Sequence, residues 1–310
     1  MMNKLIELKN LTKNFDDQQV LRGINLDIYE KEFLTLLGPS GCGKTTTLRI
    51  IAGFEEPSDG EVLFNGIEIS KLPPYKREVN TVFQKYALFP HLNVAENIGF
   101  GLNLKKVDKT VIAQKVERML KMVGLEGFGK RDVTLLSGGQ QQRVMIAMAL
   151  ACEPKLLIAD EPTTALDVTI QEQILHLIKE LNEKLGMSVL FITHDMGAVA
   201  QLCHSVKVMY LGQVVEDTTT EELFANPLHP YTEGLLACIP HLGVQRGKEL
   251  PTIPGTVPPL TKIPVGCHFC TRCKYADDRC KNTQPPLVEA GKGHLVKCWK
   301  YADQAVKEEV

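Results

Sequence analysis

Hydrophobic and polar residues alternate near the start of the chain and follow other spacings further along. The runs LIELKNL and INLDI between Leu5 and Ile28 have a period of two, which predicts half-buried antiparallel strands around a polar turn at 14–19. Between 93 and 123 the apolar residues recur at helical spacing and share one face: Ile112, Val116, Met119, Leu120 and Val123. We therefore expect an antiparallel β subdomain first and a helical subdomain later.

Three short segments are apolar almost throughout: FLTLL at 33–37, LLIA at 156–159 and SVLFIT at 188–193. Short apolar runs bounded by turn residues predict strands buried on both faces, as in a parallel sheet. Helical patterns at 46–53 and 168–186 separate them. The pattern is typical of an α/β fold, in which ligands bind where the buried strands end.

Composition adds a few limits. The chain has 310 residues and a formal net charge of −2, which suits one large α/β domain with a smaller appendage. No apolar run approaches the roughly 18 residues of a membrane span, and the first residues lack the apolar region of a signal peptide. We expect a cytosolic chain, and no basic block indicates a nucleic-acid surface.

The first buried strand runs directly into GPSGCGKT and then into a helix. This segment fits G-x-x-x-x-G-K-[ST], in which backbone N–H groups wrap phosphates, the lysine reaches the terminal phosphates and the hydroxyl coordinates Mg²⁺. The alternative is a glycine-rich turn without nucleotide, and the flanking strand and helix argue against it. The residues expected at a nucleoside triphosphate are Gly38, Pro39, Ser40, Gly41, Cys42, Gly43, Lys44, Thr45 and Thr46.

The stretch from Leu136 to Asp167 joins a glycine turn, a helix, a buried strand and two acids. Ser137 and Gln140 fit a capping box that simply begins a helix. Paired glycines also suit a turn that brings the backbone close to a phosphate. The residues of this turn therefore form a cap, a phosphate site or both: Ser137, Gly138, Gly139 and Gln140.

Polar residues follow the second and third buried strands. Asp160 ends one strand, and its carboxylate is the acid expected to face Mg²⁺. Glu161 is either a solvated carboxylate or the general base for a water held against a γ-phosphate. His194 lies at the same edge, as a structural histidine or as a contact to phosphate.

The sequence pattern alone assigns no function to Phe15 or Gln84. Phe15 is either a loop aromatic folded onto the strands or a flat surface for a nucleotide base. Gln84 follows a strand, where the ordinary interpretation is a solvated loop residue.

After Asn226 the amino-acid composition of the chain changes. A short helix in NPLHPYTEGLLACIP precedes a proline-rich segment at 251–264 and then five of the nine cysteines. The clustered cysteines are Cys267, Cys270, Cys273, Cys280 and Cys298. In a reducing compartment this clustering predicts a metal centre, and the spacing alone suits zinc and an iron–sulfur cluster equally. The others are expected to be small buried hydrophobic residues: Cys42, Cys152, Cys203 and Cys238.

The motifs GPSGCGKT, LSGGQ, LLIADEP and ALD, with the strand-end histidine, resemble those of the ATPase subunit of an ATP-binding cassette (ABC) transporter. The resemblance covers almost the whole chain. It implies an α/β P-loop NTPase fold with an ABC-type ATPase domain at 1–240, including a helical subdomain at about 90–150. A proline-rich and cysteine-rich extension is expected at 241–310.

The resemblance also implies a role for each matching residue. Phe15 stacks on adenine, and the phosphate loop spans 38–45. Mg²⁺ is contacted by Thr45, Gln84 and Asp160, and Gln84 also reaches the attacking water. The residues implied in catalysis are Lys44, Gln84, Glu161 as the base and His194 as the switch histidine.

A head-to-tail dimer follows from the resemblance, because Ser137–Gln140 would bind the γ-phosphate of an ATP held on a second subunit. That subunit is either a second copy or a related ATPase. Membrane-embedded permease subunits would follow the closing and opening of the dimer, and a substrate-binding protein would take part indirectly. The chain would lie at the cytoplasmic face of the membrane as a peripheral subunit.

Within the family, two lineages are visible. Residues from Leu5 to Gln142 resemble polyamine (spermidine/putrescine)-type importer ATPases, and the chain from Val144 onward resembles dipeptide and oligopeptide importer ATPases. We therefore expect a mosaic joined shortly after the signature. The peptide-type tail implies a [4Fe–4S] cluster, with Zn²⁺ as the alternative; the implied ligands are Cys267, Cys273, Cys280 and Cys298. Cys270 is either a spare thiol or a competitor for the metal.

The expected function is ATP hydrolysis that drives uptake of peptides or polyamines. One alternative is a mosaic that hydrolyses ATP without a coupled transporter. Another is a cassette protein acting on nucleic acid or ribosomes, which would normally carry two fused cassettes or a long coiled-coil insertion, neither of which is present in the sequence.

Overall fold

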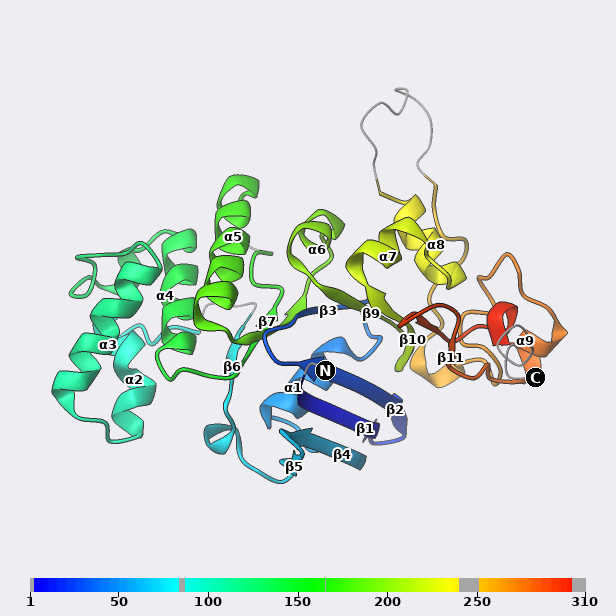
Figure 1. Ribbon diagram of the computed structural model, residues 1–310, viewed down its shortest axis with the longest axis horizontal. Coiled ribbons are helices and arrows are strands. Elements are labelled where there is room, and N and C mark those ends of the chain that lie inside the picture. Colours follow the sequence, from blue (N-terminus) through cyan, green and yellow to red (C-terminus); the bar gives the residue numbers. More distant parts are fainter. Residues whose placement is uncertain (1–2, 84–86, 165, 240–250, 303–310) are drawn as a thin grey trace.

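The computed structural model describes residues 3–83, 87–164, 166–239 and 251–302 and is drawn in Figure 1. Its strands form two sheets. The smaller sheet is antiparallel, in the order β2-β1-β4-β5, and contains β1 (Lys4–Phe15), β2 (Gln18–Tyr29), β4 (Asp59–Phe64) and β5 (Ile67–Glu68). The larger sheet has the order β11-β12-β10-β9-β3-β8-β7-β6 and contains β3 (Phe33–Leu37), β6 (Val79–Val82), β7 (Leu156–Asp160), β8 (Ser188–Ile192), β9 (Ser205–Tyr210), β10 (Gln213–Thr219), β11 (Val288–Glu289) and β12 (Leu295–Val296).

The three apolar segments form the centre of the larger sheet, as the sequence predicts. β3 pairs in parallel with β8, and β8 pairs in parallel with β7. Every residue of β3 and β8 is buried, which explains why these strands show no alternation in the sequence. Since Leu36 and Asp160 both register with Ile192, the chain leaves all three strands at one edge of the sheet.

Helices follow β3 and alternate with later strands along the chain. They are α1 (Lys44–Ala52), α2 (Val94–Leu104), α3 (Lys109–Met122), α4 (Gly138–Leu150), α5 (Val168–Leu185), α6 (Met196–Leu202), α7 (Thr220–Ala225), α8 (Pro230–Ala237) and α9 (Asp278–Asn282), with 3₁₀ turns η1 (Pro74–Lys76), η2 (Val133–Leu135) and η3 (Leu260–Lys262). None of the helices in the described ranges is long and apolar enough to span a bilayer.

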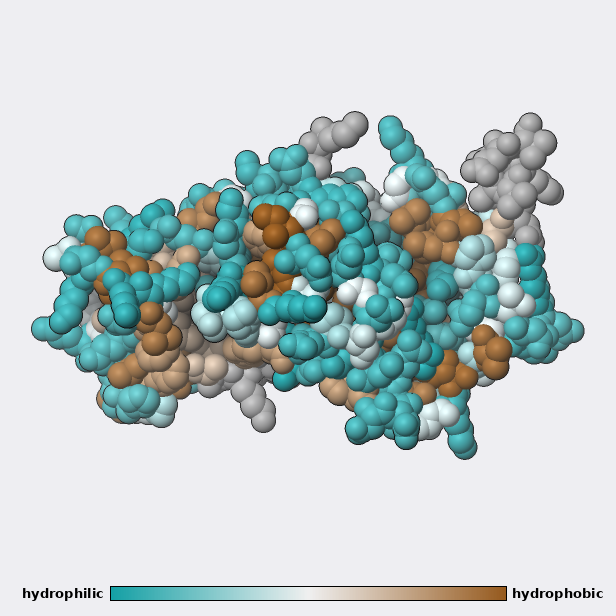
Figure 2. All heavy atoms as spheres, turned by 90° about the horizontal axis from the view of Figure 1, so that it is seen from below, coloured by the Kyte–Doolittle hydropathy of each residue, from teal (hydrophilic) through white to brown (hydrophobic). Residues whose placement is uncertain are grey.

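The helical subdomain, formed by α2, α3 and α4, occupies the left end of the molecule in Figure 1. Asn93 and Glu96 close a capping box that begins α2. The predicted apolar face of α3 is buried, with Ile112 8% and Leu120 2% exposed. Figure 2 shows hydrophobic side chains on this end of the surface, where Leu104 is 70% and Val111 38% exposed.

The C-terminal extension continues the larger sheet, which the sequence did not predict. β12 pairs with β10, so that Glu216 faces Val296 and Asp217 faces Leu295. β11 then pairs with β12 as the outermost strand. Part of the extension is therefore built onto the ATPase sheet at the right end of Figure 1.

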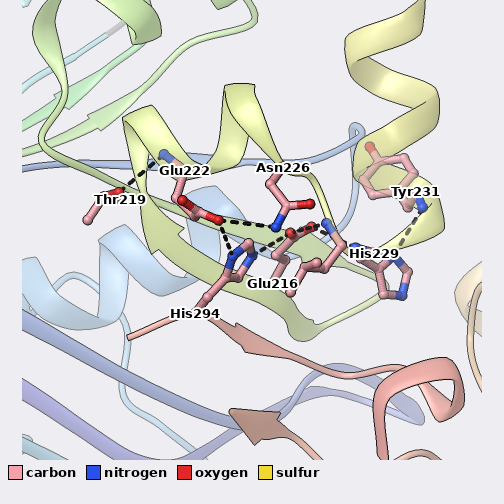
Figure 3. Close-up of polar contacts among 8 residues, drawn as sticks. Glu216, Thr219, Glu222, Asn226, His229, Tyr231 and His294 are labelled. Carbon is pink, nitrogen blue, oxygen red and sulfur yellow. Dashed lines mark hydrogen bonds and ion pairs between the residues drawn. The ribbon is translucent and has the colours of Figure 1, made fainter. Parts of the chain in front are cut away.

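A buried polar cluster joins the extension to β10 and the helices that follow it (Figure 3). His294 Nε2 lies 2.8 Å from Oε1 of Glu216, and the two side chains are 2% and 0% exposed. Glu216 also accepts hydrogen bonds from the backbone N–H groups of Leu228 at 2.7 Å and His229 at 3.1 Å. Burial works to raise the pKa of Glu216, but the hydrogen bond from His294 and the other donors lower it below its ordinary value.

The scattered cysteines are only partly as expected. Cys42 and Cys203 are buried, and burial raises the pKa of both thiols. Cys152 and Cys238 are only partly buried, so the prediction that they are buried hydrophobic residues is wrong.

Candidate functional site

The loop between β3 and α1 has the backbone of a phosphate cradle. Gly38, Gly41 and Gly43 adopt φ angles of 155°, 79° and 103°, which other residues rarely reach. A Cβ on Gly38 would stand 2.3 Å from the carbonyl oxygen of Met209. The spacing of glycines found in the sequence is therefore required by the fold itself.

Lys44 lies across this loop. Its Nζ donates to the carbonyl oxygens of Gly38 at 2.7 Å and Pro39 at 3.1 Å, and the residue is only 7% exposed. A buried ammonium at the N-terminus of a helix, within a ring of backbone groups, attracts phosphate.

Asp160 ends β7 at the same edge of the sheet. Burial raises the pKa of this carboxyl, the neighbouring carboxylate of Glu161 raises it further, and Lys44 opposes both. Two adjacent acids on a half-buried edge favour a divalent cation between them and a phosphate, and the donor set of Asp160 and the Thr45 hydroxyl consists of the oxygen ligands that Mg²⁺ prefers.

Glu161 and His194 are brought into contact, although they are 33 positions apart in the sequence. Oε1 of Glu161 lies 2.7 Å from Nε2 of His194. Thr164 Oγ1 lies 3.1 Å from the other carboxylate oxygen of Glu161, a contact that the motif analysis missed. The φ of Glu161 is 47°, so the backbone at this carboxylate is strained, as is common at functional sites.

The glycine turn of the signature begins α4 as a capping box. Ser137 N–H donates to Oε1 of Gln140 at 3.1 Å, and Gln140 N–H donates to Ser137 Oγ at 3.4 Å. A Cβ on Gly139 would stand 2.6 Å from Cγ2 of Ile170, so close packing against Ile170 also explains why a glycine occupies this position. The cap exists, and the phosphate role stays a prediction.

Of the two remaining predicted nucleotide contacts, the structure describes Phe15 but not Gln84. Phe15 is 43% exposed at the end of β1, with the ammonium of Lys13 4.9 Å from its ring centre, so one flat face is available to a base. Gln84 lies outside the described residues.

The five clustered cysteines all line one cavity of about 370 Å³. Burial raises the pKa of Cys267 to about 12 and that of Cys298 to about 11. Within the described part of the chain, no three His, Cys, Asp or Glu side chains are arranged to hold a single metal ion. The thiols therefore converge without forming a compact four-ligand site.

The fold and this edge of the sheet define a P-loop ATPase of the ABC type, with its antiparallel and helical subdomains. A family model described as "ABC transporter" matches residues 21–164. A second model, "Oligopeptide/dipeptide transporter, C-terminal region", matches 215–280. The chain belongs to the ABC transporter family of ATP-binding proteins.

Curated relatives are similar over most of the chain. The spermidine/putrescine import ATP-binding protein PotA of Clostridioides difficile is 51% identical over 231 residues, which cover 74% of this chain and 67% of that protein. PotA of Acetivibrio thermocellus is 51% identical over 229 residues, covering 74% and 65%. The chain thus spans about two thirds of the length of these relatives, and the predicted resemblance to both lineages is confirmed.

Solved structures support the same fold. The dimeric ATP-binding cassette MJ0796, in a post-hydrolysis state bound to ADP and Pi, is 35% identical with a TM-score of 0.62, covering 70% of this chain and 99% of that one. The structure of cbiO1 from Clostridium perfringens, part of the ABC transporter complex cbiONQ, is 33% identical with a TM-score of 0.68, covering 72% and 92%. The predicted fold class and ATPase activity are confirmed.

Proposed function

We propose that this chain is the ATP-hydrolysing subunit of an importer and that Glu161 is its catalytic base. The contact between Glu161 and His194 at the edge beside the phosphate loop carries the proposal. Lys44 and the loop glycines would bind the phosphates of ATP, and Thr45 and Asp160 would hold Mg²⁺; Gln84, outside the described residues, is proposed as a further contact to Mg²⁺ and the attacking water. Mg²⁺ when bound neutralises charge on the β- and γ-phosphates.

The Glu161 carboxylate accepts a proton from the attacking water, while His194 and Thr164 orient its two oxygens. A water fixed in this way is placed for in-line attack on the γ-phosphate, which is mainly a matter of position and electrostatics.

The signature turn supports a dimer in the proposal. Ser137–Gln140 begin α4 with N–H groups at a helix N-terminus, which suits an anion, and MJ0796 is a dimeric relative. A second ATPase subunit would bring its own ATP to this turn. Closure with ATP and opening after hydrolysis then move the permease subunits as a population shift.

The permease subunits are proposed to meet the helical subdomain. Leu104 and Val111 leave apolar surface exposed on α2 and α3, and hydrophobic side chains gather at the left end of Figure 2, where the helical subdomain lies. Exposed apolar patches of this kind mark protein contacts. The chain would then sit peripherally on the cytoplasmic side of a membrane complex, with a substrate-binding protein acting through the permease.

Polyamines are the proposed cargo, because the PotA relatives import spermidine and putrescine by their names. The 231 matched residues exceed the 142 that precede the predicted join, so the polyamine-type similarity continues past Gln142. Peptides are the second candidate, since residues 215–280 match the C-terminal region of oligopeptide/dipeptide transporters.

Reconstitution with permeases tests the coupling. We expect a polyamine-type permease pair in liposomes to stimulate ATP hydrolysis and to import labelled putrescine. A peptide-type pair tested in the same way with a labelled dipeptide is the matched control. Hydrolysis unchanged by either pair would reject the transport role while leaving the ATPase assignment intact.

We further propose that the extension holds a [4Fe–4S] cluster on Cys267, Cys273, Cys280 and Cys298, with Zn²⁺ as the alternative. The convergence of these thiols on one cavity of about 370 Å³ supports a metal centre. Zinc bonds of about 2.3 Å would require the four sulfurs to meet around one point, whereas a cube keeps its ligands further apart. The lining of one cavity by all five thiols suits either centre, and the cube is proposed because the C-terminal region matches the oligopeptide/dipeptide transporter model. When bound, it would supply a structural crosslink.

Colour and metal content test this centre. Protein purified without oxygen is expected to be brown, with broad absorbance near about 400 nm and iron and sulfide in equal amounts. Cys280→Ser should lose the colour, and Cys270→Ser should keep it because Cys270 is the spare thiol. Colourless protein with one zinc per chain would replace the cluster by zinc.

We also propose a division of the chain into two domains. We place the ATPase domain at 1–240 and the extension at 241–310, with the helical subdomain at about 90–150. Pairing of β12 with β10 supports a docked extension more than an independent one.

A further inference from the structure

A buried aromatic cluster joins the C-terminal extension to the ATPase core. Phe269, which is 3% exposed, comes from the cysteine-rich segment of the extension. Its ring lies edge-on to Tyr210, with centroids 5.3 Å apart at 87°, and 5.5 Å from Tyr231. Tyr210 and Tyr231 are themselves 4.9 Å apart. These three residues are called the aromatic cluster below.

Tyr210 ends β9, and the residues beside it support the phosphate loop. The carbonyl oxygen of Met209 lies against Gly38, where an added Cβ would be only 2.3 Å away. The N–H of Gly212 donates to the carbonyl oxygen of Cys42 at 3.0 Å. The end of β9 therefore contacts the loop at its first glycine and again near its last turn.

Arg272 holds the cluster from the side of the extension. Its Nε donates to Pro254 O at 2.9 Å and its Nη2 to Ile253 O at 3.2 Å. Its Nη1 donates to the Tyr210 hydroxyl at 3.5 Å, a long bond. The guanidinium thus connects the proline-rich segment of the extension to the last residue of β9.

A cavity of about 580 Å³ lies between this part of the extension and the catalytic edge. Arg272 and Ile253 line one side, and Gly38, Pro39 and His194 line the other. The aromatic cluster is the packed connection that runs beside this space. Closely packed side chains transmit displacement, whereas a cavity absorbs it.

We propose that Phe269 and Arg272 are positioning residues for ATP binding, which act through Tyr210 and Met209 on the phosphate loop. The loop binds phosphate only when its N–H groups point inward together. Because Gly38 already touches the Met209 carbonyl, any shift at the end of β9 moves the loop. The extension is then part of the ATP site. The inference rests on the assignment of the phosphate loop in the proposed function.

Steady-state ATPase kinetics test the inference. Phe269→Leu and Arg272→Met are each expected to raise KM for ATP by about fivefold or more, with a smaller change in kcat, which is the usual lower range of coupling between sites. Arg272→Lys should restore part of the affinity. Tyr210→Phe keeps the ring packing and loses the acceptor of Arg272, so its KM should rise by less.

Tyr275→Phe is the matched control. It removes another hydroxyl of the extension, which donates to Oε2 of Glu233 on α8 at 3.2 Å. Its KM should equal that of the wild type. Melting curves with and without ATP separate misfolding from loss of affinity.

Wild-type KM in folded Phe269→Leu and Arg272→Met would overturn the positioning role. If Phe269→Leu does not fold, the KM values of Tyr210→Phe and Arg272→Lys decide in its place, and wild-type values in both would reject the inference. Lys44→Ala is measured alongside. Undiminished ATP affinity in that variant would refute the phosphate-loop assignment, a failure distinct from that of the positioning role.

Discussion

Glu161→Gln is expected to lower ATP turnover by about a thousandfold, in the range that general base catalysis contributes, while leaving ATP binding intact. The amide keeps the size of the side chain and can still meet His194 and Thr164, so the strained backbone at Glu161 is retained. What it loses is the ability to accept a proton from water. The chemical step should therefore fail after the nucleotide has bound.

The same variant should accumulate a dimer in the presence of ATP and Mg²⁺. Hydrolysis is the step that opens the proposed dimer, so blocking it leaves the closed form populated. Gel filtration with light scattering, together with filter binding of labelled ATP, measures both effects. Glu183→Gln, an exposed glutamate on α5, is the control for the loss of one carboxylate. Normal turnover in Glu161→Gln would remove Glu161 as the base.

Much of the catalytic edge could be predicted from the sequence because each of its residues follows a buried strand. The phosphate loop comes directly after β3 and Asp160 ends β7, and parallel pairing to β8 brings these ends together. The contact between Glu161 and His194 follows from the same rule. The hydrophobic pattern locates the strand ends, and the pairing of β3 and β7 with β8 determines which polar residues meet.

Other parts could not be predicted, because their partners are far apart in the sequence and carry no motif. Glu216 and His294 are 78 positions apart, and each would ordinarily be taken as a surface residue. The two-residue strands β11 and β12 are too short to show a period. Thr164 lies between the motifs LLIADEP and ALD, and only its position three residues after a strained Glu161 places its hydroxyl on the carboxylate.

His294→Ala is expected to destabilise the docked extension by about 3–5 kcal/mol, because it leaves the buried carboxylate of Glu216 without its partner (Figure 3). Trp299, the single tryptophan, lies in the extension under the guanidinium of Arg279, 3.5 Å from its ring centre. Its fluorescence during urea unfolding therefore reports on the extension, while circular dichroism follows the whole chain. The fluorescence transition should move to lower urea.

His176→Ala is the matched control, since His176 pairs with Glu180 at 3.0 Å on the surface, where such a pair contributes at most about 1 kcal/mol. Equal shifts in the two variants would contradict the role of the buried pair.

Acid should release the extension through the same carboxylate. The lowered pKa of Glu216 means that the folded state holds the ionised form more strongly than the unfolded chain does. This contribution to stability is complete above the ordinary glutamate pKa of about 4.3 and is lost as the pH falls through the lower folded value. Stability followed by Trp299 fluorescence should therefore decline below about pH 4, and Glu216→Gln should flatten that decline. A decline of unchanged slope in Glu216→Gln would assign the acid sensitivity to other groups, because the glutamine cannot titrate.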